Sequence, residues 1–289
     1  MPQDGLFLTA GVDVQCDRVE ASIWAWGRAK QSWLVDHRII PGNPFERAVW
    51  DELRGLLGET RRYEGGQQLG ISMTAIDSGD GMTTAEVYAF VRRAGSTRVI
   101  AVKGQDALRQ AVGLASKTEV RRNGTKLGGL KVWPVGSSYL KGETYGWLKL
   151  DKPTEESGEE FPAGYVHLPI HAAGEEYCRQ LTAEQLVIRA GRNGFRKMEW
   201  VKTRERNEAL DCRVYARAAT AAMGMDGWGE GRWDRMADGM SAVPPFSPGQ
   251  PVPPAASPPA HLPRPPATPP QVTFRRRWSA WDRDRDSWF

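Results

Sequence analysis

Cysteine is scarce in this sequence, and several other common signals are absent. The 289 residues include only three cysteines, Cys16, Cys178 and Cys212, and none of them forms a Cys-x-x-Cys pair. An odd number of scattered cysteines argues against a disulfide framework or a zinc cluster and favours a reducing compartment. The N-terminus lacks a basic segment followed by an apolar one, and no apolar run is long enough to span a bilayer. We therefore expect a cytosolic protein.

The charges nearly balance, and the prolines are unevenly distributed. Lys and Arg number 39 against 35 Asp and Glu, which gives a formal net charge of +4, a weak indication of a polyanionic partner. With 40% hydrophobic residues the chain can build one sizeable core. Between Pro244 and Pro270 lie 13 of the 20 prolines. We expect a folded domain at 1–225, a proline-rich linker at 226–271 and a short C-terminal segment at 272–289.

The stretch Leu6–Gly27 predicts a β-hairpin that carries an unexpected acid. Its two apolar runs are separated by a short polar turn. Asp13 lies between Val12 and Val14, in a run that otherwise predicts a buried strand, where a carboxylate is disfavoured. An Asx turn that opens the hairpin would explain this residue, and so would a role as a metal ligand.

Two later segments contain further acidic residues in apolar surroundings. The run Ile71–Gly79 predicts a buried strand with Asp77 at its carboxyl end, where open α/β sheets place their sites, although a simple turn would also contain this residue. The segment Arg206–Ala222 predicts a helix in which Asp211 lies on the apolar face. That face also holds Val214, Tyr215, Ala218 and Ala219. Three carboxylates that point inward become tolerable if they converge on hard divalent cations.

The order of the predicted elements indicates an α/β fold. Ser32–Ile40 predicts a third strand, and Asn43 can cap a helix that ends near Gly58. A helix over 83–93 and a strand over 98–103 follow the strand that ends at Asp77, which implies a right-handed parallel crossover. Glu175–Val187 predicts another helix. Three antiparallel strands followed by parallel strands, in a mixed sheet flanked by helices, are what the ribonuclease H-like fold requires.

Several short motifs resemble one protein family in their order along the chain. They are LTAGVDVQCDR, TAIDSG, AVKG, GYVHLPIHAAGEEYCRQLTAEQLV and WVKTRERNEALDCRVYARAA. Over roughly Leu6–Met223 the chain resembles the nuclease domain of the bacteriophage terminase large subunit, GpA family. The resemblance implies a two-metal-ion endonuclease, using Mg²⁺ or Mn²⁺, that cuts concatemeric viral DNA for packaging in the host cytoplasm. It also implies double-stranded DNA, the portal protein and the small terminase subunit as partners.

One departure from the family concerns its packaging motor. The sequence contains no G-x-x-x-x-G-K-[ST] motif, so we expect no ATPase activity from this chain. Two other interpretations remain open. The chain could be another ribonuclease H-like enzyme, of the resolvase or transposase type. It could also be a catalytically inactive packaging adaptor that binds portal or DNA.

The matching acids are Asp13, Asp77 and Asp211, and the resemblance makes them the catalytic metal ligands. We expect Asp13 to bridge two ions and the other two acids to hold one ion each. Asn207 lies four residues before Asp211 on the same helical face, so it is either a lesser ligand or an orienting group. If Asn207 only caps the helix, Glu208 takes its place as a ligand.

Basic residues supply candidate DNA contacts. Lys103, at the end of its strand, could contact the scissile phosphate or could be a solvated strand end. A predicted hairpin turns at Asn123-Gly124, and its cations could grip DNA phosphates or form a solvated turn. These cations are Lys117, Arg121, Arg122 and Lys126.

The last residues, which follow the proline-rich stretch, are again rich in aromatic side chains. Trp278, Trp281, Trp288 and Phe289 are interleaved with arginines on a segment too short to bury them. We expect this segment to dock on the portal, and a disordered basic tail is the alternative.

Overall fold

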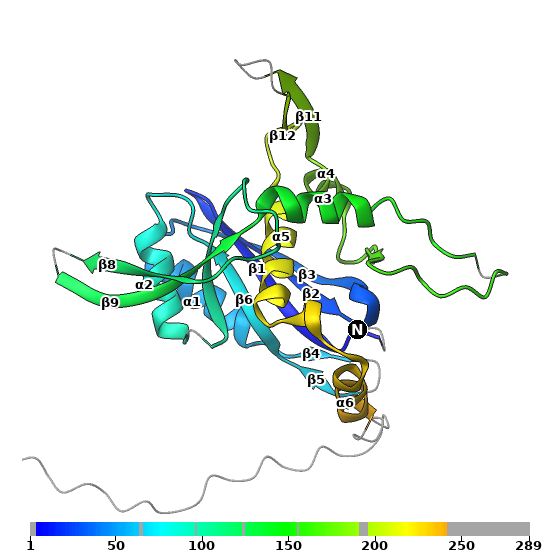
Figure 1. Cartoon of the computed structure of the whole chain (residues 1–289). Coiled ribbons are helices and arrows are strands. Elements are labelled where there is room, and N and C mark those ends of the chain that lie inside the picture. Colours follow the sequence, from blue (N-terminus) through cyan, green and yellow to red (C-terminus); the bar gives the residue numbers. More distant parts are fainter. Residues whose placement is uncertain are drawn as a thin grey trace, which may run out of the picture. The chain divides into compact units, whose positions relative to one another are not determined.

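The computed structural model describes residues 4–63, 66–95, 97–122, 125–154, 156–190 and 196–241, with the backbone alone for 119–122, 125–128, 190, 240 and 241. Figure 1 shows the arrangement of their helices and strands. The predicted docking residues Trp278, Trp281, Trp288 and Phe289 lie outside these ranges. None of the helices described is both long enough and apolar enough to cross a membrane.

The chain begins with the predicted antiparallel meander. Strands β1 (Phe7–Val14), β2 (Arg18–Trp26) and β3 (Ser32–Pro41) pair in sequence order. Every residue of β1 is buried, because the strand lies in the middle of the sheet with both faces covered. The three predicted strands are therefore confirmed.

A parallel unit follows the meander. Helix α1 (Arg47–Gly58) leads through the small strands β4 (Arg61–Arg62) and β5 (Gln68–Leu69) to strand β6 (Ile71–Asp77). Strand β6 is parallel to β1. Helix α2 (Thr84–Ala94) then connects β6 to the parallel strand β7 (Val99–Gly104). This strand, helix and strand unit confirms the predicted crossover.

The far edges of the sheet are completed by later segments. Strands β8 (Ser116–Arg122) and β9 (Thr125–Val135) form the predicted hairpin, and β9 is parallel to β7. After helix α3 (Ser137–Trp147), the short strand β10 (Val166–His167) pairs with β3. The strand order is β10-β3-β2-β1-β6-β7-β9-β8. Its central part, three antiparallel strands followed by parallel ones, is the ribonuclease H-like arrangement that the sequence predicts.

The predicted helix over Glu175–Val187 is wrong in its second half. Helix α4 (Glu175–Leu181) is short, and the chain continues as strand β11 (Glu184–Ala190) paired with β12 (Arg196–Lys202). Val187 and Ile188 favour a strand, and cross-strand pairing overrides the local helical pattern. The two strands form a separate ribbon that extends beyond α3 and α4 (Figure 1).

The C-terminal part of the described chain is helical for longer than expected. Helix α5 (Glu208–Ala222) is followed by a short 3₁₀ turn at Met225–Gly227 and by helix α6 (Glu230–Ser241). The prediction that a linker begins at residue 226 is therefore wrong for 226–241. The reason is that Trp233 of α6 is buried against Phe7 and Trp228, which supplies the apolar contact a linker would lack.

Two apolar cores cover the two faces of the sheet. One contains Trp24 and Trp26 together with Leu210 and Val214 of α5. The other contains Val12 together with residues of α1 and α2, among them Trp50 and Phe90. The sheet is thus sandwiched between α5 on one face and α1 with α2 on the other (Figure 1).

Helix α5 lies directly on strand β1 because residue 11 has no side chain. A Cβ atom added at Gly11 would lie 1.9 Å from the carbonyl oxygen of Cys212 and 2.4 Å from the backbone nitrogen of Ala216. The Oγ1 of Thr9 donates to the Ala216 carbonyl at 2.9 Å and accepts from the Trp26 indole at 2.8 Å. Glycine is therefore required for the close approach of this helix and strand.

We expect Gly11→Ala to lower the free energy of unfolding by about 3 kcal/mol, because the new methyl group would overlap backbone atoms that cannot move independently. Denaturant unfolding measures the change. Gly55→Ala is the matched control, since no atom lies within 4 Å of an added Cβ there, and alanine in helix α1 should be neutral or stabilising. Equal stability of the two variants would contradict the proposed contact.

Candidate active site

Three acidic residues from distant parts of the chain meet at one end of the sheet. Asp13 is the next-to-last residue of β1, and Asp77 is the last residue of the parallel neighbour β6. Val12 pairs with Ile76, so the two acids follow each other on adjacent strands. Asp211 lies in the first turn of α5, which packs on β1. The topology therefore brings together all three carboxylates that the sequence singled out.

The three carboxylates share an electrostatically unfavourable environment, in which Asp13 is buried and Asp77 and Asp211 are half-buried. Burial raises the pKa of Asp13 well above its ordinary value, and the charges of Asp211 and Asp77 raise it further. Burial also raises the pKa of Asp77 and that of Asp211. Since a low dielectric strengthens repulsion between like charges, the site concentrates negative charge that a cation would relieve.

Each acid is held by a donor of its own. The Gln15 amide donates to Asp13 Oδ2 at 2.5 Å, and the Gly79 backbone N–H donates to Asp77 Oδ1 at 3.0 Å. Asp77 also has the Tyr215 hydroxyl as a hydrogen-bonding neighbour, which lowers its pKa and so opposes the effect of burial. These donors fix the orientation of the carboxylates before any ligand binds.

Asp211 belongs to a closed ring of four polar side chains. Lys141 of α3 lies 2.7 Å from Glu184 Oε1 and 3.5 Å from Asp211 Oδ1. Asn207 Nδ2 donates to Glu184 Oε1 at 2.8 Å and to Asp211 Oδ2 at 2.9 Å. One ammonium and one amide therefore bridge two carboxylates. Burial alone would lower the pKa of Lys141, but the charges of Asp211 and Glu184 raise it, so the ammonium stays charged.

This ring bears on the role expected of Asn207. Asn207 stands at the N-cap position of α5, yet its side chain makes no capping hydrogen bond. Its amide nitrogen faces the two carboxylates instead, which favours the orienting role over that of a metal ligand. The alternative ligand Glu208 is engaged elsewhere, because it pairs with Arg18 at 2.6 Å and with Arg206 at 3.4 Å.

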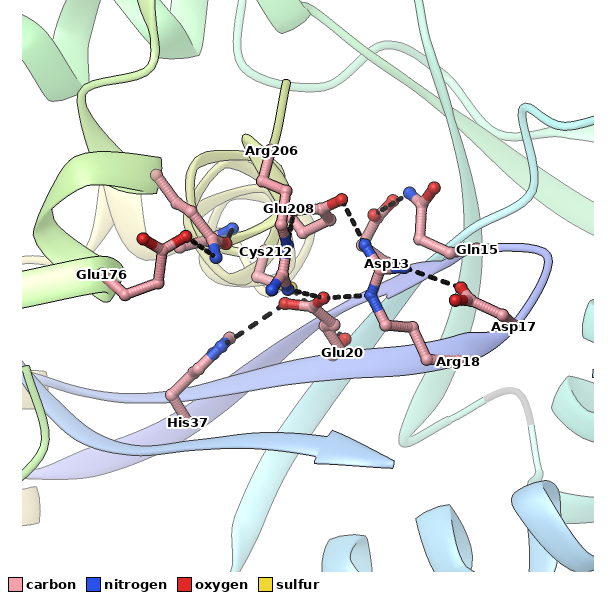
Figure 2. Close-up of polar contacts among 12 residues, drawn as sticks. Asp13, Gln15, Asp17, Arg18, Glu20, His37, Glu176, Arg206, Glu208 and Cys212 are labelled. Carbon is pink, nitrogen blue, oxygen red and sulfur yellow. Dashed lines mark hydrogen bonds and ion pairs between the residues drawn. The ribbon is translucent and has the colours of Figure 1, made fainter. Parts of the chain in front are cut away.

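A second buried network supports the other side of Asp13 (Figure 2). Glu20 lies opposite Asp13 in the register of β1 and β2, and its Oε1 is 2.6 Å from both Arg18 and Arg206. Burial would raise the pKa of Glu20, but His37 and the two arginines lower it to about 2. The carboxylate is therefore charged, and it ties the β1–β2 hairpin to the residues that precede α5.

The chemistry of the donor set fits a hard divalent cation. Carboxylate oxygens are the ligands that Mg²⁺ and Mn²⁺ accept, and Asp13, Asp77 and Asp211 supply them from a rigid sheet and helix. Within the described ranges, no group of three His, Cys, Asp or Glu side chains is already arranged to hold a metal ion. The physical reason is that the acids repel one another and each is drawn to its own protein donor.

The predicted DNA-contacting residues are spread along one side of the sheet. Lys103 is exposed and follows Val102, which pairs with Asp77 on the neighbouring strand. Lys117 is exposed on edge strand β8. Arg121 and Arg122 end β8 and Lys126 lies near the start of β9, with side chains outside the description. The register of β9 with β7 puts this hairpin turn at the opposite end of the parallel strands from the acids.

Lys141 and Glu184 were not predicted from the sequence to belong to the site. Lys141 lies in a helix that carries no motif, and Glu184 falls inside the segment wrongly predicted as helical. A cross-strand register for β11 and β12 would have been needed to place Glu184 at the root of the ribbon beside Asp211. No local signal in the sequence distinguishes these two residues from ordinary surface charges.

The strand order and the three acids at the carboxyl ends of β1 and β6 and on α5 define the ribonuclease H-like class. A comparison with protein families is more specific. Residues 1–233 match the model described as "Terminase large subunit gpA, endonuclease domain". The chain therefore belongs to the family of gpA terminase large-subunit endonuclease domains, as the motifs predicted.

Two curated relatives are terminase large subunits. That of Escherichia phage lambda is 33% identical over 221 residues, and that of Enterobacteria phage P21 is 30% identical over 219 residues. Each alignment covers 76% of this chain and 33% of the relative, so the chain spans about a third of the length of the relatives that it matches.

Solved structures of similar fold include two terminase nucleases. The nuclease domain of the SPP1 large terminase, solved with bound Mn, aligns with a TM-score of 0.34 and 10% identity, over 75% of this chain and 86% of that one. The large terminase nuclease of thermophilic phage G20c aligns with a TM-score of 0.38 and 12% identity, over 73% of this chain and 80% of that one.

We expect Asp13→Asn to raise the free energy of unfolding at neutral pH, in a buffer containing a chelator, by on the order of 1 kcal/mol. Because the folded-state pKa of Asp13 is raised, the wild-type protein loses stability as the pH rises above about 4, the unfolded-state pKa. The gain should therefore vanish at lower pH. Denaturant unfolding at several pH values measures it.

Asp17→Asn is the matched control for this prediction. Asp17 lies in the turn next to β1, and its side chain is 66% exposed, so its removal should change stability by less than about 0.5 kcal/mol. A loss of stability in Asp13→Asn at neutral pH would assign Asp13 a structural role instead.

Proposed function

We propose that this chain is a two-metal-ion DNA endonuclease that cuts concatemeric viral DNA for genome packaging. The observation that carries the proposal is the meeting of the buried Asp13 with the half-buried Asp77 and Asp211 at one end of a ribonuclease H-like sheet. Family membership supports a nuclease. Burial raises the pKa of all three acids, and neighbouring carboxylates raise those of Asp13 and Asp211 further, which supports a site built to receive positive charge.

The acids have separate tasks in this proposal. Asp13, whose pKa both other acids raise, would be the shared ligand, and Asp77 and Asp211 would each hold one cation. When bound, the two divalent cations, Mg²⁺ or Mn²⁺, activate water and neutralise the leaving 3′-oxygen. The protein supplies rigidity, because Gln15, Gly79 and Asn207 orient the three carboxylates.

Two lysines assist in different ways. Lys141 is a positioning residue, since it holds Asp211 and Glu184 together and keeps their net charge low. Lys103 is exposed beside the strand of Asp77, where an ammonium could contact a phosphate of the bound strand. The more distant cations Lys117, Arg121, Arg122 and Lys126 would contribute phosphate contacts without reading sequence.

The biological setting follows from the family in this proposal. The substrate is double-stranded DNA, and the partners are the portal protein and the small terminase subunit, in the cytoplasm of the bacterial host. The C-terminal residues Trp278, Trp281, Trp288 and Phe289 remain the proposed portal-docking segment, tethered by the proline-rich stretch.

Nicking of supercoiled plasmid in the presence of Mn²⁺ tests the proposal. We expect Asp13→Asn, Asp77→Asn and Asp211→Asn each to reduce the rate by on the order of a hundred-fold or more. The reason is that even residues that only support metal ligands cost about ten- to a hundred-fold when removed. The circular dichroism spectrum should stay that of the wild type.

Asp151→Asn is the matched control, because Asp151 is exposed on the loop after α3. It should nick at the wild-type rate. Full activity in any one of the three variants would remove that residue from the site, and a wild-type protein that binds DNA without nicking it would support the inactive adaptor instead.

A further inference from the structure

The β11–β12 ribbon exposes an apolar stripe on one of its faces. Leu186 is 49% exposed, Ile188 63% and Met198 65%. Ile188 pairs directly with Met198, and Leu186 pairs with Trp200, so these side chains lie on the same face. These exposed apolar side chains form a continuous patch on a solvated ribbon and contribute little to the core. Such a patch is typical of a binding surface.

The root of this stripe is fixed rigidly next to the acids. Trp200 packs against Tyr145 of α3 with a centroid distance of 4.9 Å and donates to the Ser138 carbonyl at 3.3 Å. The Tyr145 hydroxyl donates to the carbonyl of Glu184, the first residue of β11, at 2.5 Å. Glu184 itself belongs to the ring around Asp211. The root of the ribbon therefore lies beside Asp211.

The charges around the stripe are mostly positive. On the apolar face, Arg196 lies beyond Met198 and the exposed Lys202 lies at the root. Lys202 is near enough to lower the pKa of Asp211. Lys197 is exposed on the other face. Across the part of the chain that is described, Arg196 and Lys197 make no ion pair, and the one acid on the apolar face, Glu184, is buried and paired with Lys141.

We propose that the β11–β12 ribbon inserts into a groove of duplex DNA beside the cleaved phosphate, with Ile188 and Met198 as a wedge between base pairs. This inference rests on the proposed nuclease function. A two-stranded ribbon has the width of a DNA groove, and Ile, Leu and Met are among the side chains that unstack base steps when they insert. Arg196 and Lys202 would contact the phosphates on either side of the wedge.

A protein partner is a weaker fit to the same surface. Protein interfaces concentrate their binding energy in buried Trp, Tyr and Arg, whereas the exposed side chains of this stripe are aliphatic. A wedge that opens one base step beside the acids would also present a distorted phosphodiester to them, and distortion costs least at flexible steps.

Fluorescence of aminopurine, placed in a short duplex, measures the unstacking. All proteins carry Asp77→Asn so that the duplex stays intact in the presence of Mg²⁺. Binding should raise the fluorescence, and Ile188→Ala combined with Met198→Ala should remove at least half of the rise and weaken binding about ten-fold. The dependence of binding on salt should not change, because the phosphate contacts remain.

Ile170→Ala is the matched control, since Ile170 is 95% exposed on a loop outside the ribbon and the change is chemically the same. It should behave as the parent protein. All three positions are exposed, so the variants should unfold at the parent temperature.

Two results with DNA would overturn the wedge: no rise in fluorescence when the parent protein binds, or the same rise and affinity for the parent and the double variant. The wedge would also be overturned if the double variant lost binding to the portal protein but kept the parent's DNA affinity and fluorescence. Plasmid nicking by the wild-type chain with Mn²⁺ is measured separately. A chain that does not nick but still shows the wedge signal would refute the nuclease proposal alone, and a chain that nicks without the signal would refute the wedge alone.

Discussion

The contact between helix α5 and strand β1 at Gly11 is the constraint on which the site depends. The helix approaches the strand so closely that no side chain fits at this position. Asp13 follows two residues later on the strand, and Asp211 comes just before Cys212, whose carbonyl oxygen lies over Gly11. The same contact that packs the core therefore sets the distance between two of the acids, so the stability of the fold and the geometry of the site cannot vary independently.

Charge compensation is the second organising feature of this region. Three carboxylates gathered at one largely enclosed place would destabilise the fold if each lacked a partner. The chain limits that cost with separate devices on the two sides of the site. Lys141 and Asn207 bridge Asp211 to Glu184, and Arg18 and Arg206 neutralise Glu20 next to Asp13. What remains unneutralised is the negative charge of the acids themselves, which is where a cationic ligand gains most.

The β11–β12 ribbon extends from the neighbourhood of the acids beyond α3 and α4 (Figure 1). Strands β11 and β12 are not part of the main sheet, and they are attached at the root, where Tyr145 packs on Trp200 and Glu184 bonds to Lys141 and Asn207. An element that is rigid at its root and solvated along its length can follow a groove of DNA without disturbing the acids. In the proposed mechanism the ribbon would hold the substrate and the acids would carry the chemistry, and both would adjoin Glu184.

Elements with strong local periodicity could be predicted from the order of residues alone. The apolar runs around Asp13 and Asp77 and the helical face shared by Asp211 and Tyr215 were readable because burial imposes periods of two and 3.6 residues. The antiparallel meander and the parallel unit that follows it were predicted from short connections and the crossover rule. The acids stood out because a charge in an apolar run is locally improbable.

The partners that surround those acids depend on packing between distant parts of the chain. Lys141 and Glu184 are separated by more than forty residues along the chain and meet through helix packing and cross-strand register, which leave no local trace. The helix expected through Val187 and the linker expected from residue 226 were wrong for the same reason. Glu184 and Trp233 owe their conformations to contacts with distant residues. Local propensity is worth a fraction of a kcal/mol per residue, and burial of a tryptophan or pairing of a ribbon outweighs it.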